Sequence, residues 1–311
     1  MFVYLLRRLL YTIPILLGVS LIVFVLFHMV GGDPTYQMLG KHANPEQVQT
    51  LRHELGLDQP LTTQFFFYLK QVVTFDYGRS YSTKQPISDM ILNGIGPSLT
   101  LAIPAFFLTT VFAILISLFV AYFRGTWIDK GVVVLCVVGM SIPSLAYILF
   151  GQHILAYRWG LFPISGYEID FPDRLQYIVM PALIWVMVSL GMDVRFFRNA
   201  ILDETHQDYV RTARSKGLSE KFIFLKHVLK NSMIPIVTYV VIEIPFLLLG
   251  AFLLESFFGI PGLGSITIDA INSSDFPVLK AMTTINSLLF ILGTLATDIV
   301  YTWVDPRVRL K

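Results

Sequence analysis

Cysteine and charged residues are both scarce in this chain. Of its 311 residues 14% are charged, whereas soluble globular proteins contain about 25%. The single cysteine, Cys136, lies in an apolar run, which excludes a disulfide within the chain, and no His/Cys spacing typical of a metal site occurs. A net charge of +2 is too small to indicate nucleic acid as a partner. With 55% hydrophobic residues, the composition is that of a polytopic membrane protein.

Sequence motifs of catalysis and nucleotide binding are also missing. There is no phosphate-binding loop of the Gly-x4-Gly-Lys-Ser/Thr type and no Ser/His/Asp or metal-ligand constellation. The histidines, such as His153 and His206, are isolated and show no ligand spacing. We therefore expect a protein that is not an enzyme, with no metal site and no cofactor bound by this chain.

Long apolar runs are what the sequence does contain. A helix of about 20 apolar residues crosses the roughly 30 Å hydrocarbon core of a bilayer. Six runs of this order predict an all-α membrane protein with six transmembrane helices in a single domain, residues 1–311. The expected spans are residues 9–30, 99–123, 131–157, 177–192, 234–254 and 281–303. The first is longer than the apolar core of a signal peptide, about 7 to 15 residues, and we interpret it as a permanent span.

Lys and Arg are unevenly distributed between the expected loops. On one side of the bilayer, 15 lie in 65 residues: 1–8, 124–130, 192–233 and 304–311. On the other side, 8 lie in 113 residues: 31–98, 158–176 and 255–280. Because loops rich in Lys and Arg stay in the cytoplasm, we expect both termini and residues 193–233 to be cytoplasmic. Residues 31–98 then form a long external loop, with helices expected at residues 45–55 and 63–74.

The longest polar interval in the second half, residues 204–235, is rich in Lys and Arg. Residues 207–216 show helical spacing of apolar side chains, and Gly217 favours a left-handed helix end. Ser219 is expected to cap a second helix. The interval thus predicts two short amphipathic helices joined at a glycine. A basic loop lying on anionic lipid is the alternative interpretation.

Two carboxyl side chains, Glu243 and Asp298, fall inside expected spans. A carboxylate at the centre of a bilayer costs about 2.5 to 3.5 kcal/mol on insertion scales, so each should face the bundle interior, water or a partner. Asp298 could reach Tyr301 or Arg307 in a structural role. Glu243 is the candidate for the translocation path, and a hydrogen bond between helices is its equally good alternative.

Short motifs recur in order along nearly the whole chain. They include Arg7-Arg8-Leu9, Gly32-Asp33-Pro34, Phe75-Asp76-Tyr77-Gly78-Arg79-Ser80, Glu255 with Phe258-Gly259-Ile260-Pro261-Gly262-Leu263-Gly264, and Asp305-Pro306-Arg307. The strongest is Asp208-Tyr209-Val210-Arg211-Thr212-Ala213-Arg214-Ser215-Lys216-Gly217-Leu218. Together they resemble the permease subunits of bacterial ABC importers in the dipeptide, oligopeptide and nickel group.

The resemblance implies a type I ABC importer permease fold in the bacterial inner membrane. It also implies partners: a second homologous permease subunit, two cytoplasmic ATPase subunits that bind ATP and Mg, and an extracytoplasmic substrate-binding protein. Arg211-Thr212-Ala213 stands where related permeases have Glu-Ala-Ala, in the loop that docks on the ATPases. The coupling helix would then comprise Asp208, Tyr209, Val210, Arg211, Thr212, Ala213 and Gly217. We expect the ATPase to cover Tyr209, Val210 and Ala213, with the basic residues at the rim.

The expected function is therefore ATP-driven uptake of short peptides, di- or oligopeptides, delivered by the binding protein. A nickel or metal-chelate importer of the same group is the alternative. A secondary transporter should show an internal repeat or a chain of charges inside the membrane, and neither is evident. A membrane-embedded hydrolase would need paired acids or His/acid motifs within the spans, which the sequence lacks.

Overall fold

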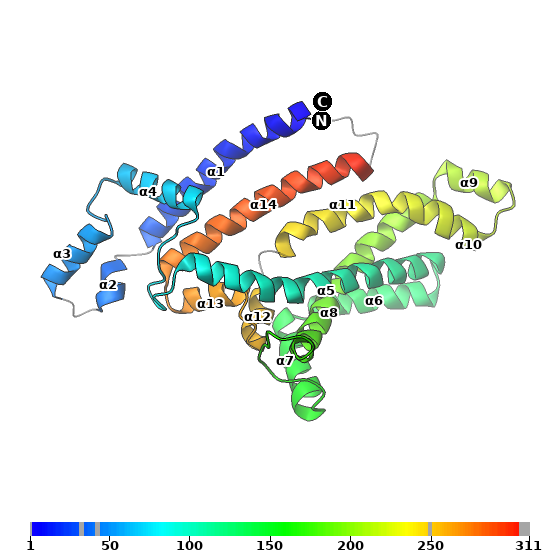
Figure 1. Cartoon of the computed structure of the whole chain (residues 1–311). Coiled ribbons are helices and arrows are strands. Elements are labelled where there is room, and N and C mark those ends of the chain that lie inside the picture. Colours follow the sequence, from blue (N-terminus) through cyan, green and yellow to red (C-terminus); the bar gives the residue numbers. More distant parts are fainter. Residues whose placement is uncertain (1, 31–33, 41–43, 248–250, 305–311) are drawn as a thin grey trace.

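The computed structural model describes the chain except for residues 1, 31–33, 41–43, 248–250 and 305–311, and the described part is almost entirely helical (Figure 1). The helices are α1 (Phe2–Val30), α2 (Pro34–Leu39), α3 (Pro45–Glu54), α4 (Leu61–Thr74), α5 (Ile87–Tyr122), α6 (Trp127–Ser141), α7 (Ser144–Gly151), α8 (Arg174–Thr205), α9 (Asp208–Ser215), α10 (Glu220–Phe222), α11 (Leu229–Leu247), α12 (Phe252–Phe258), α13 (Leu263–Asn272) and α14 (Phe276–Val304). Two π-helical segments, η1 (Gln152–Arg158) and η2 (Ile223–Val228), continue α7 and join α10 to α11.

Five helical segments are long and apolar enough to cross a membrane, and a sixth span results if α6 and the α7–η1 helix count as one. That pair is bent by 91°. The bend has a local cause: Ile142 precedes Pro143 and adopts an extended backbone, and a residue before proline is disfavoured in the α-helical region. The all-α class is therefore confirmed, and the number of candidate spans agrees with the expected six when the bent pair counts as one span.

Several helices differ in length from the expected spans. α5 begins at Ile87, where a loop up to residue 98 was expected, and α8 continues to Thr205 through residues expected to be cytoplasmic loop. α5 extends because Ile87 and Ile91 are buried against Leu263 and Ala270 of α13. An apolar run marks only the part of a helix that is apolar all round, so a span that continues as an amphipathic helix is longer than its run.

The polar extension of α8 is held by an ion pair. Arg198 donates two hydrogen bonds to the Asp129 carboxylate of α6, at 2.7 and 2.8 Å, and Asp129 also accepts one from the backbone N–H of Gly125 at 2.9 Å. Asp129 is buried. Removing one partner of a buried ion pair strands the other charge, so this contact fixes α6 against α8 at the end where the α9–α10 hairpin begins.

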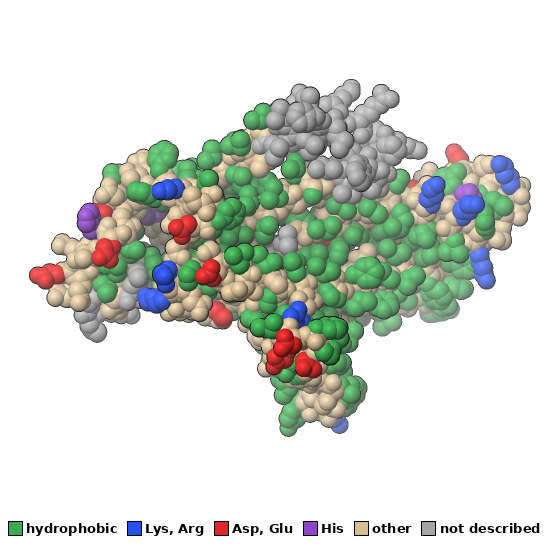
Figure 2. Space-filling model, in the orientation of Figure 1, with side chains coloured by type: hydrophobic (Ala, Val, Ile, Leu, Met, Phe, Trp, Pro, Cys, Tyr) green, Lys and Arg blue, Asp and Glu red, His purple; other side chains and the backbone are tan. Residues whose placement is uncertain are grey.

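The long helices lie side by side in a bundle (Figure 1). α5 packs along α8, which also contacts α6, and α14 lies between α1 and α11. The hairpin of α9 and α10 lies at one end of the bundle, beyond the C-terminal ends of α5 and α8; α2 to α4 and α13 lie toward the other end (Figure 1). Hydrophobic side chains dominate the middle of the surface, and Lys and Arg gather over the α9–α10 end (Figure 2).

Candidate functional site

The hairpin of α9 and α10 turns at a glycine, as its sequence predicts. Gly217 has a φ of 75°, and its N–H donates to the Arg214 carbonyl at 2.9 Å. Ser219 has the extended backbone of an N-cap, but its side chain makes no capping hydrogen bond, so that detail of the prediction is wrong. The second helix is instead held by its apolar side chains and continues through η2 into α11.

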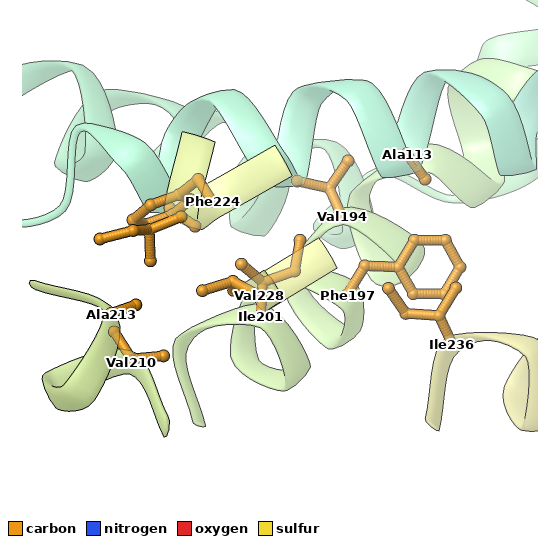
Figure 3. Packing of buried hydrophobic residues seen from close by; sticks show 11 residues of the cluster. Ala113, Val194, Phe197, Ile201, Val210, Ala213, Phe224, Val228 and Ile236 are labelled. Atoms are coloured by element: carbon orange, nitrogen blue, oxygen red, sulfur yellow. The ribbon is translucent and has the colours of Figure 1, made fainter. Parts of the chain in front are cut away.

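The apolar face of α9 packs within the chain itself. Val210 is fully buried and Ala213 is 6% exposed, and both belong to a cluster with Ile201, Ile223 and Phe224 (Figure 3). The expectation that an ATPase covers Val210 and Ala213 is therefore wrong. The end of α8 and the η2 segment supply the apolar surface that covers these side chains, and their burial against it fixes the direction of α9.

Tyr209 joins α9 to the preceding helix. It is half-buried, and its hydroxyl donates to the Glu204 carboxylate at 2.5 Å. Burial, followed by this hydrogen bond to Glu204, raises the pKa of Tyr209 to about 12, so the phenol stays protonated and remains a donor at neutral pH. Tyr209 thus links α8 to α9 through this hydrogen bond and is not a fully exposed side chain.

The opposite face of α9 is polar and exposed. It presents Arg211 and Thr212, and the Arg211 side chain is 74% exposed and 3.5 Å from Asp208. Arg214 donates two hydrogen bonds to Glu220, at 2.7 and 3.1 Å, across the glycine turn. An exposed ion pair contributes only about 0 to 1 kcal/mol, yet this one links the two arms of the hairpin. The surface available to another protein is therefore cationic and polar. Its shape is determined by the packing of the buried face of α9 against α8 and η2.

A second polar group lies between α8 and α11. The Tyr239 hydroxyl donates to Asp193 at 3.1 Å, and Phe196 stacks on the Tyr239 ring with centroids 4.4 Å apart. Glu243 follows Tyr239 by one helical turn and interacts with both Tyr239 and Asp193. Asp193 is 4% exposed. Sequence reasoning missed Asp193 because the expected span ended at Met192. The available signal was a carboxylate directly after an apolar run whose helical pattern continues beyond it.

Glu243 is therefore part of a hydrogen-bonded group and not an isolated carboxylate. Its hydrogen-bond partner, Tyr239, lies on the same helix, and the hydrogen bond that crosses to α8 is the one from Tyr239 to Asp193. Glu243 is half-buried, so part of its side chain remains accessible. The side chain of Asp298, the other acid of the expected spans, lies outside the described residues.

At the opposite end, Glu255 forms the centre of a buried corner. It has no exposed surface, and its carboxylate accepts hydrogen bonds from the Ser98 hydroxyl of α5 and the backbone N–H groups of Ala251, Gly264 and Ser265, at 2.7 to 3.2 Å. Ser98 in turn accepts from the N–H of Leu263 at 2.8 Å. One carboxylate thus joins α5, α12 and the first turn of α13, where N–H groups have no partner within the helix.

The glycines of this corner are required by close contacts. A Cβ on Gly264 would lie 2.8 Å from the Phe252 backbone, and one on Gly262 would lie 2.5 Å from the Ser98 hydroxyl and overlap the Glu255 carboxylate. Both distances are shorter than any ordinary carbon contact. Residues 255 to 264, which belong to the motifs noted in the sequence, therefore form one packed unit.

Asp275 makes a similar joint between the segment before α5 and the start of α14. It is 2% exposed and accepts hydrogen bonds from the Ser80 hydroxyl at 2.5 Å and from the N–H groups of Tyr81 and Ser82 at 3.2 and 3.1 Å. Burial, with the nearby Asp275 charge, raises the pKa of Tyr81 to about 12. The segment before α5, which also contains sequence motif residues, is thus fixed to the start of α14.

Across the part of the chain that the structure describes, no cluster of three or more His, Cys, Asp or Glu side chains could hold a metal ion.

Comparison with known proteins covers almost the whole chain. Residues 113–310 match the family described as "Binding-protein-dependent transport system inner membrane component", and residues 1–102 match its N-terminal family. The glutathione transport system permease protein GsiC of Salmonella choleraesuis (strain SC-B67) is 36% identical over 308 residues, which cover 99% of each chain. GsiC of Escherichia coli (strain K12) is 35% identical over the same length and share.

Proposed function

Because this chain belongs to the family of inner membrane components of binding-protein-dependent transport systems, we propose that it conducts short peptides into the cell. As a member of that family it is a multi-pass inner membrane protein and the permease subunit of an ABC importer. Such a subunit provides the passage, while ATPases and a binding protein supply energy and substrate.

The observation that carries the peptide assignment is the full-length similarity to a glutathione permease. Glutathione is a small peptide-like molecule with an amine, two carboxylates and amide bonds. A passage for such molecules needs polar groups inside the membrane, and the group of Asp193, Tyr239 and Glu243 supplies hydrogen-bonding side chains there. We propose that Glu243, on the accessible side of that group, lies along the path. Nickel or a metal chelate is the competing substrate.

The energy for transport would come from partner subunits. We propose that two ATPases, which hold ATP and Mg, attach at the α9–α10 hairpin on the cytoplasmic side, and that a second permease subunit completes the passage. The residues that would touch the ATPase are Arg211, Thr212 and their exposed neighbours, because Val210 and Ala213 are already covered. Asp208 and Gly217 would set the start and end of the coupling helix.

Uptake by reconstituted complexes tests the proposal. Proteoliposomes with all four subunits should accumulate labelled di- or tripeptides only when ATP and the cognate binding protein are supplied. Mass spectrometry of the ligand that copurifies with the binding protein identifies the natural substrate. A nickel ion or metal chelate in place of a peptide, together with no peptide uptake, would overturn the peptide assignment and leave the permease role intact.

Thiol labelling tests the orientation on which these roles depend. Ser215 on α9 and Thr50 on α3 are both exposed. A cysteine at Ser215 should react with an impermeant reagent only after the cytoplasmic side is opened, and one at Thr50 should react from outside. Reaction of both from the same side would contradict the proposed topology.

A further inference from the structure

Three lysines are exposed along the segment that leads from the glycine turn into α11. Lys221 lies on α10, Lys226 on η2 and Lys230 in the first turn of α11. They belong to the end of the bundle where Lys and Arg gather (Figure 2). Among the ion pairs of the described residues, none involves these three side chains. The lysine segment, residues 220–230, thus presents three cations without an acidic partner.

The acid nearest to these lysines in sequence is already engaged elsewhere. Glu220 accepts two hydrogen bonds from Arg214, at 2.7 and 3.1 Å. The ammonium of Lys226 lies 4.9 Å from the centre of the Phe222 ring, which attracts a cation but carries no net charge. A lysine ammonium has three N–H donors, and an anionic oxygen is the partner that they lack here. The lysine segment is therefore suited to an anionic ligand.

The lysine segment is continuous with a membrane span, and this determines its depth. Glu220–Leu247 forms one candidate span of 28 residues, whereas about 20 are enough to cross the hydrocarbon core. The uncharged run begins at Ile234. At 1.5 Å per residue, Lys230 precedes it by about 6 Å along the helix, Lys226 by about 12 Å and Lys221 by about 20 Å. The headgroup region is about 5 to 7 Å thick on each side, and long basic side chains reach toward it. Lys230 and Lys226 therefore reach the headgroups, and Lys221 lies farther out.

Charge and depth together identify the contact. The cytoplasmic leaflet contains anionic lipids, which attract Lys and Arg close to its surface. The Lys/Arg distribution predicts that this end of the bundle is cytoplasmic. Phe222 and Leu225 are exposed beside the lysines and suit the apolar side of the same interface. We propose that Lys226 and Lys230 bind phosphate groups of anionic lipids in the inner leaflet, with a smaller contribution from Lys221.

The two arms of the hairpin then have different partners. The exposed face of α9, with Arg211 and Lys216, is left for the ATPase, whereas α10 and η2 lie against lipid. The two interpretations of residues 204–235, a coupling hairpin and a basic loop on anionic lipid, thus describe different arms of one structure. The lipid surface rests on the proposed orientation of the chain and is independent of the transported substrate.

The test compares the two arms directly. The complete transporter, purified in detergent, is titrated with phosphatidylglycerol, and bound lipids are counted by native mass spectrometry. Phosphatidylcholine provides a headgroup without net charge. The lysine variant combines Lys226→Gln and Lys230→Gln. The matched control combines Arg211→Gln and Lys216→Gln, which removes the same charge from α9. Copurification of the ATPase subunits is measured for both variants, and lipids are counted on the permease subunits wherever the ATPases are lost.

We expect the lysine variant to bind phosphatidylglycerol about tenfold more weakly than the wild type, because each lost cation removes attraction to an anionic headgroup. Its affinity for phosphatidylcholine and its ATPase content should not change. Lys221→Gln, farther from the headgroups, should weaken phosphatidylglycerol binding by less than about twofold. The control should bind phosphatidylglycerol normally and retain less ATPase. Lys226→Arg with Lys230→Arg keeps both charges and should bind as the wild type does.

The lipid surface is overturned by unchanged phosphatidylglycerol binding in the lysine variant or by an equal loss in the control. It is also overturned if the lysine variant loses its ATPases and keeps its lipid, since the surface then belongs to the ATPase. If the double variant does not assemble, Lys226→Gln and Lys230→Gln are measured singly, and wild-type binding in both contradicts the proposal.

Peptide uptake separates this proposal from the proposed function. Lysine-dependent lipid binding without peptide uptake by the wild type supports the lipid surface and overturns the peptide assignment. Normal peptide uptake with lysine-independent lipid binding overturns the lipid surface alone.

Discussion

The corner of α12 and α13 and the hairpin of α9 and α10 both contain charged residues, but the charges lie in opposite places. In the corner, Glu255 is buried and accepts hydrogen bonds from backbone N–H groups and the Ser98 hydroxyl. In the hairpin, the buried residues are apolar, and Arg211 and Arg214 lie on the surface. The corner uses its charge to hold its own backbone, whereas the hairpin presents its charges on the surface, each arginine beside an acidic side chain of the hairpin itself.

Because of this difference, the two regions should respond differently to substitution. A buried carboxylate with several donors is sensitive to every atom around it, since each lost hydrogen bond leaves a donor without a partner. An apolar cluster tolerates change of shape better, and surface charges contribute little to folding. Substitutions in the corner should therefore act on stability, and substitutions on the exposed face of the hairpin on partner binding.

Removal of the Glu255 carboxylate should have the largest effect. Glu255→Ala leaves three backbone N–H groups and the Ser98 hydroxyl without their acceptor, and each buried unsatisfied group costs about 1 to 3 kcal/mol. We expect little folded protein, or a markedly lower melting temperature in detergent. Ser98→Ala, which removes one donor and one acceptor, should cost less. Unchanged melting of Glu255→Ala would show that the corner does not depend on this carboxylate.

A charge placed behind α9 should have the next largest effect. Val210→Asp puts a carboxylate into the apolar cluster, so the hairpin should detach from α8 and η2. The corner around Glu255 should stay folded. Limited proteolysis should then cut within residues 206–219, and the ATPase subunits should no longer copurify. Thr212→Asp adds the same charge on the exposed face and should leave resistance to the protease intact. Equal cleavage of both variants would show that the inner face of α9 is not what holds it.

A substitution at the glycine turn should have an intermediate effect. The φ of Gly217 is 75°, and no atom lies within 4 Å of a Cβ built there, so only the backbone opposes a side chain. Gly217→Val should lower the free energy of unfolding by about 1 to 2 kcal/mol or change the direction of α10. Asparagine tolerates this backbone conformation. We expect Gly217→Val to lower the peptide transported per ATP hydrolysed and Gly217→Asn to preserve it. Similar ratios for both would mean that the turn conformation is not needed for coupling.

The smallest effect is expected between the two regions, at Glu243. Glu243→Gln keeps a hydrogen-bonding group next to Tyr239 on the same helix, and even hydrogen bonds between helices in membranes contribute on average well under ~1 kcal/mol. Uptake should therefore remain close to wild type, measured as the initial rate in proteoliposomes. Loss of uptake in a fully assembled complex would make the charge of Glu243 itself necessary along the path.

Much of the fold follows from the sequence because the apolar runs are long. The helix at residues 208–215, the left-handed Gly217, and the helices α3 and α4 also agree with their local patterns. Local patterns succeed where the cause is local, such as a glycine free to take a positive φ or a proline that starts a helix.

What could not be predicted depends on contacts between distant residues. Val210 looks like a partner-binding residue because the sequence shows its amphipathic helix but not the η2 segment that covers it. Asp193 looks like the end of a span until Tyr239, 46 residues later, supplies its hydrogen bond. The role of Glu255 requires Ser98, 157 residues earlier, and the N–H groups of a helix that begins after a turn. In each case the missing information is the tertiary neighbour.

The length of α5 gives it a mechanical role as a lever. This one helix contributes Ser98 to the corner around Glu255 and Ala121 to the apolar cluster that covers α9. At 1.5 Å per residue these two points are about 35 Å apart along the axis. A rotation of α5 by about 5° around one point would displace the other by about 3 Å, which is the length of a hydrogen bond. If α5 moves as a rigid rod, a tilt of that size imposed at the cluster that covers α9 displaces Ser98 by about the length of its hydrogen bond to Glu255.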